Sequence, residues 1–280
     1  MASTATLEQI RAYYANLVTA GTGGDTAVRS AFASVPRERF LGPGPWEVFA
    51  LADGQYVTTP SADPVFIYQN VLVGLKPEEG VNNGDPSLHA RMLSALNLSP
   101  GEAVLHLGCG TGYYSALIAE LVGEDGSVLA IDIDSSLTAL AQTNLSPWQQ
   151  ATVDCRSATD GALPVSDAIY VNAGANMVVR HWVEALKPNG RLLFPLLGES
   201  GWGANLLVTN TDRGYAARFV NRAGFIACVG AQNPEDGLDI DRAFASGRWD
   251  MVRSLHFDTP ADDTCWVAGQ DWWLSTAAVP

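Results

Sequence analysis

Three closely spaced glycines are the residues of this chain whose type and spacing best suit ligand chemistry. Gly108, Gly110 and Gly112 directly follow the short, mainly apolar run 103–107, and apolar residues at helical spacing begin at Tyr114. Glycine lets the backbone turn sharply and approach a ligand closely, because it has no Cβ. A strand, a glycine turn and a helix open the nucleotide-binding units of α/β proteins, so this stretch predicts a nucleotide site.

The spacing of the glycines distinguishes between kinds of nucleotide. A dinucleotide fingerprint, G-x-G-x-x-G/A, requires a small residue where this chain has Tyr113, which disfavours a nicotinamide oxidoreductase. The next predicted strand ends in Asp132, whose carboxylate can accept both hydroxyls of an adenosine ribose. The pattern G-x-G-x-G resembles motif I of the S-adenosylmethionine-dependent methyltransferases. An ordinary βαβ unit with a glycine turn is the alternative interpretation.

Composition limits the partners of the chain. Its 280 residues, of which 47% are hydrophobic, fit one large domain or a domain with appendages. The net charge of −14, without a basic run, argues against a nucleic-acid partner. No signal pattern and no run approaching about 18 apolar residues occurs, so we expect no membrane partner and a cytoplasmic protein. The four cysteines are widely separated, which predicts reduced thiols and no metal site.

Strand and helix patterns alternate through the middle of the chain, which predicts an α/β fold with a doubly wound, mostly parallel, seven-stranded Rossmann-like sheet. The alternating strands are predicted at 103–107, 127–132, 151–155, 168–172 and 191–196. Three further strands without helices between them, at 204–210, 215–220 and 225–229, predict an antiparallel edge.

We expect three segments along the chain. Residues 1–100 form a helical and loop-rich N-terminal cap, in which Asp25 and Asp85 cap helices. Residues 101–230 form the S-adenosylmethionine-binding domain, and residues 231–280 form a C-terminal extension that packs on it. In this extension a short helix precedes a tail rich in tryptophan. The tail predicts an added strand or hairpin, with substrate contact as the alternative.

Four segments together resemble the protein-L-isoaspartate O-methyltransferase family. They are Ala31–Phe40 with its Val-Pro-Arg, Pro86–Ala90 with its histidine-alanine pair, Ala103–Tyr114 as motif I, and Lys187–Pro195. The resemblance extends over residues 25–230 and implies S-adenosyl-L-methionine as cofactor. It also implies methylation of a carboxylate on a protein or peptide. A small-molecule or peptide natural-product O- or N-methyltransferase on the same fold is the alternative.

The chain departs from that family at three places. The family has a serine, thought to help hold the methyl-accepting carboxylate, at the position of Gly84, and an acidic residue at the position of His106. These two changes also fit a module that binds the cofactor without turnover. The family's acidic-glycine pair after the third strand is matched best by Asp160-Gly161, and an alternative alignment places Ala158 there.

The expected chemistry is an in-line displacement, in which the protein mainly positions the reactants. A carboxylate acceptor is already ionised at pH 7 and needs hydrogen-bond donors rather than a base. Asn82, Asn83, Ser87 and the helix start at Pro86 are predicted to supply such donors. For a phenol, alcohol or amine acceptor, His89 is the candidate base, with a structural role as the alternative.

The predicted site therefore has two parts. The catalytic residues are predicted to be His89, Ser87 and Asn83. The cofactor-binding residues are predicted to be Gly108, Gly110, Thr111, Gly112, Tyr113, Asp132, Ile133, Asp160, Gly161 and Asn172. Asp134 is predicted to cap the following helix rather than to bind the ribose.

Overall fold

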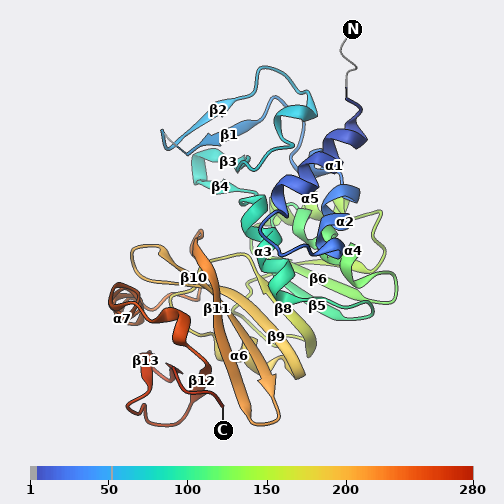
Figure 1. Cartoon of the computed structure of the whole chain (residues 1–280). Helices are drawn as coiled ribbons and strands as arrows, with labels where there is room; N and C mark the ends of the chain where they lie inside the picture. The colour runs from blue at the N-terminus through green and yellow to red at the C-terminus, as the bar shows by residue number, and fades with distance from the viewer. Residues whose placement is uncertain (1–4, 52, 280) are drawn as a thin grey trace. The chain divides into compact units, whose positions relative to one another are not determined.

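The structure, a computed structural model, describes residues 5–51 and 53–279 (Figure 1). The chain forms two compact units. The first unit comprises the chain up to Gly101 together with Cys109–Val128 and Asp134–Asp154. The second comprises Glu102–Gly108, Leu129–Ile133 and the chain from Cys155 onward.

Among its described residues the first unit contains five α-helices. They are α1 (Leu7–Val18), α2 (Thr26–Ser34), α3 (Pro86–Leu96), α4 (Tyr113–Val122) and α5 (Ser135–Asn144). Four of them begin at a polar side chain that caps the helix, whereas the N-cap of α4 is Gly112. Asp25, Asp85 and Asp134 accept backbone N–H groups at the starts of α2, α3 and α5, which confirms the predicted caps. Thr6 and Gln9 add a reciprocal capping box at α1.

Short strands and single 3₁₀ turns lie between α2 and α3. They are η1 (Arg37–Phe40), β1 (Glu47–Ala50), β2 (Gln55–Thr58), η2 (Pro64–Phe66), β3 (Gly74–Lys76), η3 (Pro77–Glu79) and β4 (Val81–Asn82). We call residues Val73–Asn83, which contain the antiparallel pair β3 and β4, the ribbon. An antiparallel bridge from Val48 to Val73 joins the β1–β2 hairpin to the ribbon, beside which it lies in Figure 1.

A ten-stranded sheet carries the α/β part of the chain, in the order β13-β14-β12-β11-β10-β9-β8-β5-β6-β7. Its strands are β5 (Ala103–Leu107), β6 (Ser127–Asp132), β7 (Ala151–Cys155), β8 (Ser166–Val171), β9 (Leu186–Leu197), β10 (Trp202–Thr211), β11 (Gly214–Gly224), β12 (Ser254–Phe257), β13 (Cys265–Ala268) and β14 (Trp272–Ser275). Strand β8 pairs in parallel with β5 and β9, whereas the pairs from β9 to β13 are antiparallel. The doubly wound α/β fold and its antiparallel edge are confirmed.

The sheet is wider than predicted, because the C-terminal residues extend it. Seven of the eight predicted strand segments form strands of this sheet. The segment 231–280 contains the helix α7 (Pro234–Ser246) and the strands β12, β13 and β14, which bring the number to ten. Trp272 and Trp273 are buried in β14, which confirms the added-strand interpretation of the tail. The hydrophobic core of the second unit connects the C-terminal strands to the central strands of the sheet. It contains large side chains such as Trp182, Phe194 and Trp272.

The predicted strand 225–229 is wrong. Ala227 makes a single parallel bridge with Gly174, a residue that lies beyond the end of β8. The N–H of Gly174 donates to the carbonyl of Ile226, and that of Cys228 donates to Gly174. Because β8 has already ended, no longer ladder forms there, and the apolar run that suggested a strand becomes an extended connection.

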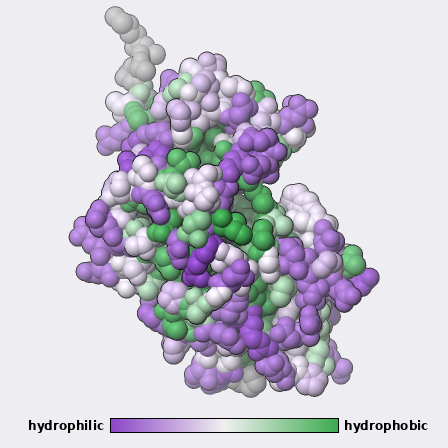
Figure 2. All heavy atoms as spheres, turned by 180° about the vertical axis from the view of Figure 1, so that it is seen from behind, coloured by the Kyte–Doolittle hydropathy of each residue, from purple (hydrophilic) through white to green (hydrophobic). Residues whose placement is uncertain are grey.

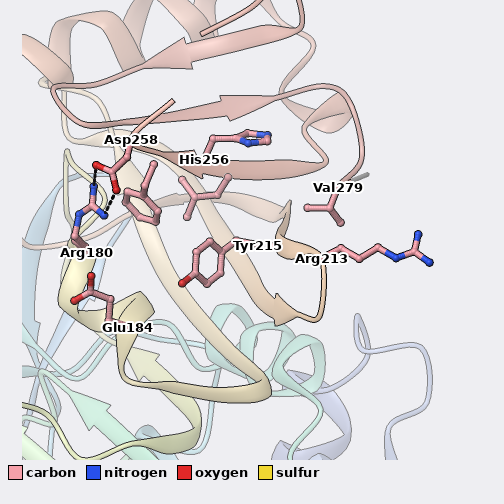
Figure 3. Close-up of a pocket in the computed structure, with 10 residues that line it drawn as sticks. Arg180, Glu184, Arg213, Tyr215, His256, Asp258 and Val279 are labelled. Carbon is pink, nitrogen blue, oxygen red and sulfur yellow. Dashed lines mark hydrogen bonds and ion pairs between the residues drawn. The ribbon is translucent and has the colours of Figure 1, made fainter. Parts of the chain in front are cut away.

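Hydrophilic side chains cover most of the face in Figure 2, as the net charge of −14 leads one to expect. No helix within residues 5–51 and 53–279 combines the length and the apolar character needed to cross a bilayer. A hollow of about 440 Å³ in the second unit is shown in Figure 3. The paired Arg180 and Asp258 line it, together with Tyr215 and His256.

Candidate cofactor and acceptor site

The order of the strands reverses between β5 and β8. From β5 the chain proceeds outward through β6 and β7, then returns to β8 on the other side of β5. In open α/β sheets, ligands bind beyond the carboxyl ends of the strands at such a switch point. The hollow of Figure 3 lies at the other end, because α6 (Arg180–Glu184) leads directly into the start of β9. It is therefore separate from the candidate site.

Three predicted site residues meet at this switch point in the second unit. Leu107 is opposite Val171 in the β5–β8 register, so the residues that follow, Gly108 and Asn172, lie side by side. The Asn172 N–H donates to the Leu107 carbonyl at 2.7 Å, and the Gly108 N–H donates to the carbonyl of Ile131 at 2.8 Å. The ends of β5, β6 and β8 therefore converge, with Asp132 as the last residue of β6.

Gly108 is required by the backbone at this place. Its φ is +78°, in the left-handed region that favours glycine. A Cβ on Gly108 would lie 3.3 Å from the carbonyl carbon of Asn172, which is closer than ordinary packing. The predicted sharp turn after β5 is thus a feature of the structure.

Asp132 lies beside groups that suit a ribose and a planar base. The Arg156 N–H donates to the Asp132 carbonyl at 3.0 Å, so the chain after β7 runs next to the end of β6. Burial, and secondly the negative charge of Asp132, raise the pKa of the Cys228 thiol to about 11. The next residue, Ile133, exposes 54% of its surface. A carboxylate beside an exposed apolar side chain can bind sugar hydroxyls and one face of a heterocycle.

The remainder of the glycine turn lies in the first unit and presents backbone rather than side chains. Gly110 and Gly112 have φ of +55° and +93°, and a Cβ on Gly112 would lie 3.0 Å from Leu145 Cδ1. The buried Thr111 hydroxyl donates to the Phe40 carbonyl at 2.7 Å. The Thr111 side chain therefore holds the turn against η1 and is not available to a ligand.

Tyr113 is buried in an aromatic cluster of the first unit. Its ring contacts those of Phe32 and Phe40 at centroid distances of 6.3 and 5.6 Å. Burial raises its pKa well above the ordinary value. The ring is therefore part of the core, and a contact between Tyr113 and a cofactor would involve its backbone.

His89 occupies the space next to Gly84. Its side chain is 1% exposed and stacks on the Tyr114 ring, with a centroid distance of 3.7 Å and an interplanar angle of 20°. Gly84 has φ of +78°, and a Cβ there would lie only 2.2 Å from His89 Nε2. The family's serine therefore cannot be placed at this position while the imidazole stays where it is.

The other predicted acceptor-binding residues make hydrogen bonds within the first unit. Asn83 is buried, and its Oδ1 accepts the Val73 N–H at 3.0 Å and an Arg37 N–H at 3.3 Å. The Ser87 N–H donates to Asn70 Oδ1 at 2.8 Å. Asn82 Oδ1 accepts the Gly84 N–H at 2.9 Å, which is the turn chemistry expected of asparagine.

Asp160 is exposed in the loop after β7. With Gly161 it is the better match to the family's acidic-glycine pair, and Ala158 is the alternative. The Asp160 carbonyl accepts an N–H of Arg156 at 3.1 Å, and Gly161 has φ of +74°. The carbonyl of Ala158 instead accepts the Trp182 indole N–H at 2.8 Å and is thus engaged inside the second unit.

The sequence analysis gave Arg37 only as part of the Val-Pro-Arg segment that resembles the family, and it predicted no role for its side chain. Its side chain is fully buried, and its guanidinium donates to the carbonyls of Ile67, Gln69 and Val71 and to Asn83. The available signal was a charged residue between the buried Val35 and Phe40. Buried arginine must be hydrogen-bonded, but the sequence does not say to what.

A doubly wound sheet with a glycine turn at its switch point, and a carboxylate at the end of the next strand, defines a class I S-adenosylmethionine-dependent methyltransferase. Comparison with known proteins gives the family. The sequence model described as protein-L-isoaspartate(D-aspartate) O-methyltransferase matches residues 9–232. The chain belongs to this family.

Relatives and solved structures agree with that membership. The protein-L-isoaspartate O-methyltransferase of Methanopyrus kandleri is 31% identical over 74% of this chain and 87% of its own length. That of Ignicoccus hospitalis is 28% identical over 79% of this chain and 98% of its own. A solved protein-L-isoaspartate O-methyltransferase has a TM-score of 0.65 at 20% identity, covering 94% of this chain and 86% of its own.

A second solved structure includes a ligand. It is a putative protein-L-isoaspartate O-methyltransferase of Plasmodium falciparum in complex with S-adenosyl-L-homocysteine. Its TM-score is 0.61 at 18% identity, over 78% of this chain and 97% of its own. The two structures share the fold of this chain, and the family match ends at residue 232, before α7.

Proposed function

We propose that this enzyme transfers a methyl group from S-adenosyl-L-methionine to a carboxylate of a protein or peptide, with an isoaspartyl side chain as the acceptor class. The observation that carries the proposal is the convergence of Gly108, Asp132 and Asn172 at the switch point. We also propose the three-part organisation 1–100, 101–230 and 231–280, with methyl transfer in the middle part.

The residues at the strand ends fit the cofactor. A Cβ would fill the space beside Gly108, and Asp132 and Ile133 offer a carboxylate and an exposed apolar surface. We assign the ribose hydroxyls to Asp132 and the adenine to Ile133, with Asp160, Gly161 and Asn172 around them. The backbone of Gly108, Gly110, Thr111, Gly112 and Tyr113 supplies the remaining contacts. When bound, the cofactor supplies an electrophilic methyl group on a sulfonium.

The protein's task is then to position the acceptor and to exclude water. A carboxylate is ionised at pH 7 and attacks without a general base. The buried stack of His89 on Tyr114 favours the structural alternative for the histidine, in which it supports the turn at Gly84. We assign the acceptor's hydrogen bonds to the Ser87 hydroxyl in the first turn of α3 and to the Asn83 region.

One observation favours the alternative function, a small-molecule or peptide natural-product O- or N-methyltransferase. Gly84 stands where the family has the serine thought to help hold the carboxylate, and the structure leaves no room there for a Cβ. An acceptor that does not need that hydroxyl would suit this site equally well.

Methyl transfer to matched peptides tests the two functions. Purified enzyme, labelled S-adenosylmethionine and a peptide containing isoaspartate should give a methyl ester that is lost in mild base. The same peptide with ordinary aspartate is the control and should remain unlabelled. Base-stable label on amine or phenol acceptors, without label on the isoaspartyl peptide, would support the alternative function.

We also propose a cytoplasmic location and acceptors that are proteins or peptides rather than nucleic acids. The acidic composition supports proteins or peptides over nucleic acids as acceptors. The four cysteines, which form no disulfide in the described chain, support the cytoplasmic location.

A further inference from the structure

We infer that the outer part of the ribbon, residues 75–81, which we call the tip, is a releasable wall of the cofactor site, and that Lys76 is a positioning residue that acts through Asp134. In this role Lys76 sets how long the cofactor stays bound. The inference rests on the proposed function, because it takes the glycine turn to be the place where the cofactor binds.

The tip contacts two elements of the cofactor site within the first unit. Leu75 Cδ1 lies 3.7 Å from the point where a Cβ on Gly110 would be, so this side chain covers the middle of the glycine turn. The next residue, Lys76, forms an ion pair with Asp134. Asp134 is the N-cap of α5 and follows Asp132 by two residues. The tip therefore bridges the turn and the start of α5.

The root of the ribbon is held firmly by buried groups. The Arg37 guanidinium, 0% exposed, donates to the Val71 carbonyl at 2.7 Å on one side of the ribbon and to Asn83 Oδ1 at 3.3 Å on the other. Asn83 Oδ1 also accepts the Val73 N–H. Hydrogen bonds of a charged donor in a buried site are strong, so the two ends of the ribbon are fixed together.

The tip is held by weaker, more exposed groups. The side chains of Lys76 and Asp134 are 23% and 25% exposed. The hydrogen bond from Lys76, followed by that from Ser136, lowers the pKa of Asp134, so the pair stays ionised at neutral pH. Ion pairs near the surface contribute little and are screened by salt. A fixed root and a weakly held tip allow the tip to open while the first unit stays folded.

The test measures the rate at which S-adenosylhomocysteine leaves the full-length enzyme, followed by displacement in stopped flow. Lys76→Met removes the cation, and Asp134→Asn removes the charge but keeps a good N-cap. Each change should speed release about two- to five-fold, and the double variant should be no faster than either single one. Lys76→Arg should restore the wild-type rate, and melting temperatures should stay close to wild type.

Glu79→Gln is the matched control. Glu79 lies 3.9 Å from Lys76 and is 58% exposed, so its loss should leave the release rate unchanged. Added salt should speed release from the wild type and have little effect on Lys76→Met. Wild-type release rates in both single variants, or additive effects in the double variant, would overturn the inference. If the wild type does not bind S-adenosylhomocysteine at all, the proposed function fails and the inference with it.

Discussion

The glycine turn and the ribbon are shaped by different kinds of interaction. At the turn, left-handed backbone angles and close neighbours disfavour a Cβ on Gly108 and Gly112. The ribbon instead depends on side chains far away in the sequence, Arg37 at its root and Asp134 at its tip. A shape that the local backbone dictates is visible in the sequence as glycine, whereas a shape that distant side chains dictate is not.

The largest expected effect breaks the ribbon at its root. Arg37→Met removes a buried guanidinium and leaves the carbonyls of Ile67, Gln69 and Val71 without their donor. We expect a loss of about 3 kcal/mol or more in the free energy of unfolding, measured by urea denaturation. Arg39→Met is the control, because Arg39 also donates to carbonyls but is exposed, and it should cost under about 1 kcal/mol. Equal losses would show that the root is not specially stabilised.

The strand that leads into the turn has a pH-dependent stability. Burial lowers the pKa of His106 from 6.5 to about 3, so the unfolded chain binds a proton that the folded chain does not. Stability from this group is complete above about pH 6.5 and is lost as the pH falls toward 3. At pH 4 the cost is about 3 kcal/mol.

The variant His106→Leu should flatten this acid-side slope by one proton, as measured by denaturation at several pH values. Tyr170→Phe is the control, since Tyr170 lies opposite His106 in the β5–β8 register and burial raises its pKa well above the ordinary value. It should leave the slope between pH 3 and 7 unchanged. An unchanged slope in His106→Leu would contradict the account.

A smaller effect tests the turn itself. Gly112→Ala introduces a Cβ at φ +93° and 3.0 Å from Leu145, so it combines backbone strain with overlap. We expect a loss of about 2–3 kcal/mol and much weaker binding of S-adenosylhomocysteine. Gly101→Ala, at φ +85° with open space around its Cβ, should cost only about 1 kcal/mol. If the two variants behave alike, close packing does not define the turn.

The smallest effect on activity is expected from a substitution at Gly84, where the ribbon meets α3. Gly84→Ser should destabilise the fold by about 2–3 kcal/mol, because φ is +78° and the buried imidazole of His89 must move. It should not raise activity on an isoaspartyl peptide, because the hydroxyl enters only by moving the imidazole. Gly80→Ser, at φ +71° with open space, separates backbone strain from that displacement. A gain of activity in Gly84→Ser would show that the family's hydroxyl can be restored.

Local patterns predicted the α/β fold, the caps at Asp25, Asp85 and Asp134, and the turn at Gly108. Each of these depends on residues a few positions apart. The sequence did not reveal that β12, β13 and β14 widen the sheet, nor that the segment 225–229 forms a single β-bridge, at Ala227, instead of a strand. Strand pairing depends on where the neighbouring strand ends, and a single sequence carries no local signal for that.

In the candidate site, too, local patterns were predictable from the sequence and contacts between distant segments were not. The positions of Gly108, Asp132 and Asn172 at strand ends follow from the strand pattern, and the structure brings them together. The burial of His89 against Tyr114, and the role of Arg37 in holding Asn83, arise from contacts between distant segments. Those contacts decide which polar groups remain available to an acceptor, so the acceptor was the least predictable part.

Titration calorimetry with S-adenosylhomocysteine tests the central claim, that the strand ends hold an adenosyl cofactor through Asp132. The wild type should bind, and Asp132→Ala should bind about 100-fold more weakly, because two hydrogen bonds to a carboxylate are lost. Asp212→Ala, in the turn between β10 and β11, should bind like the wild type. No heat with the wild type, or equal affinity in Asp132→Ala, would contradict the account.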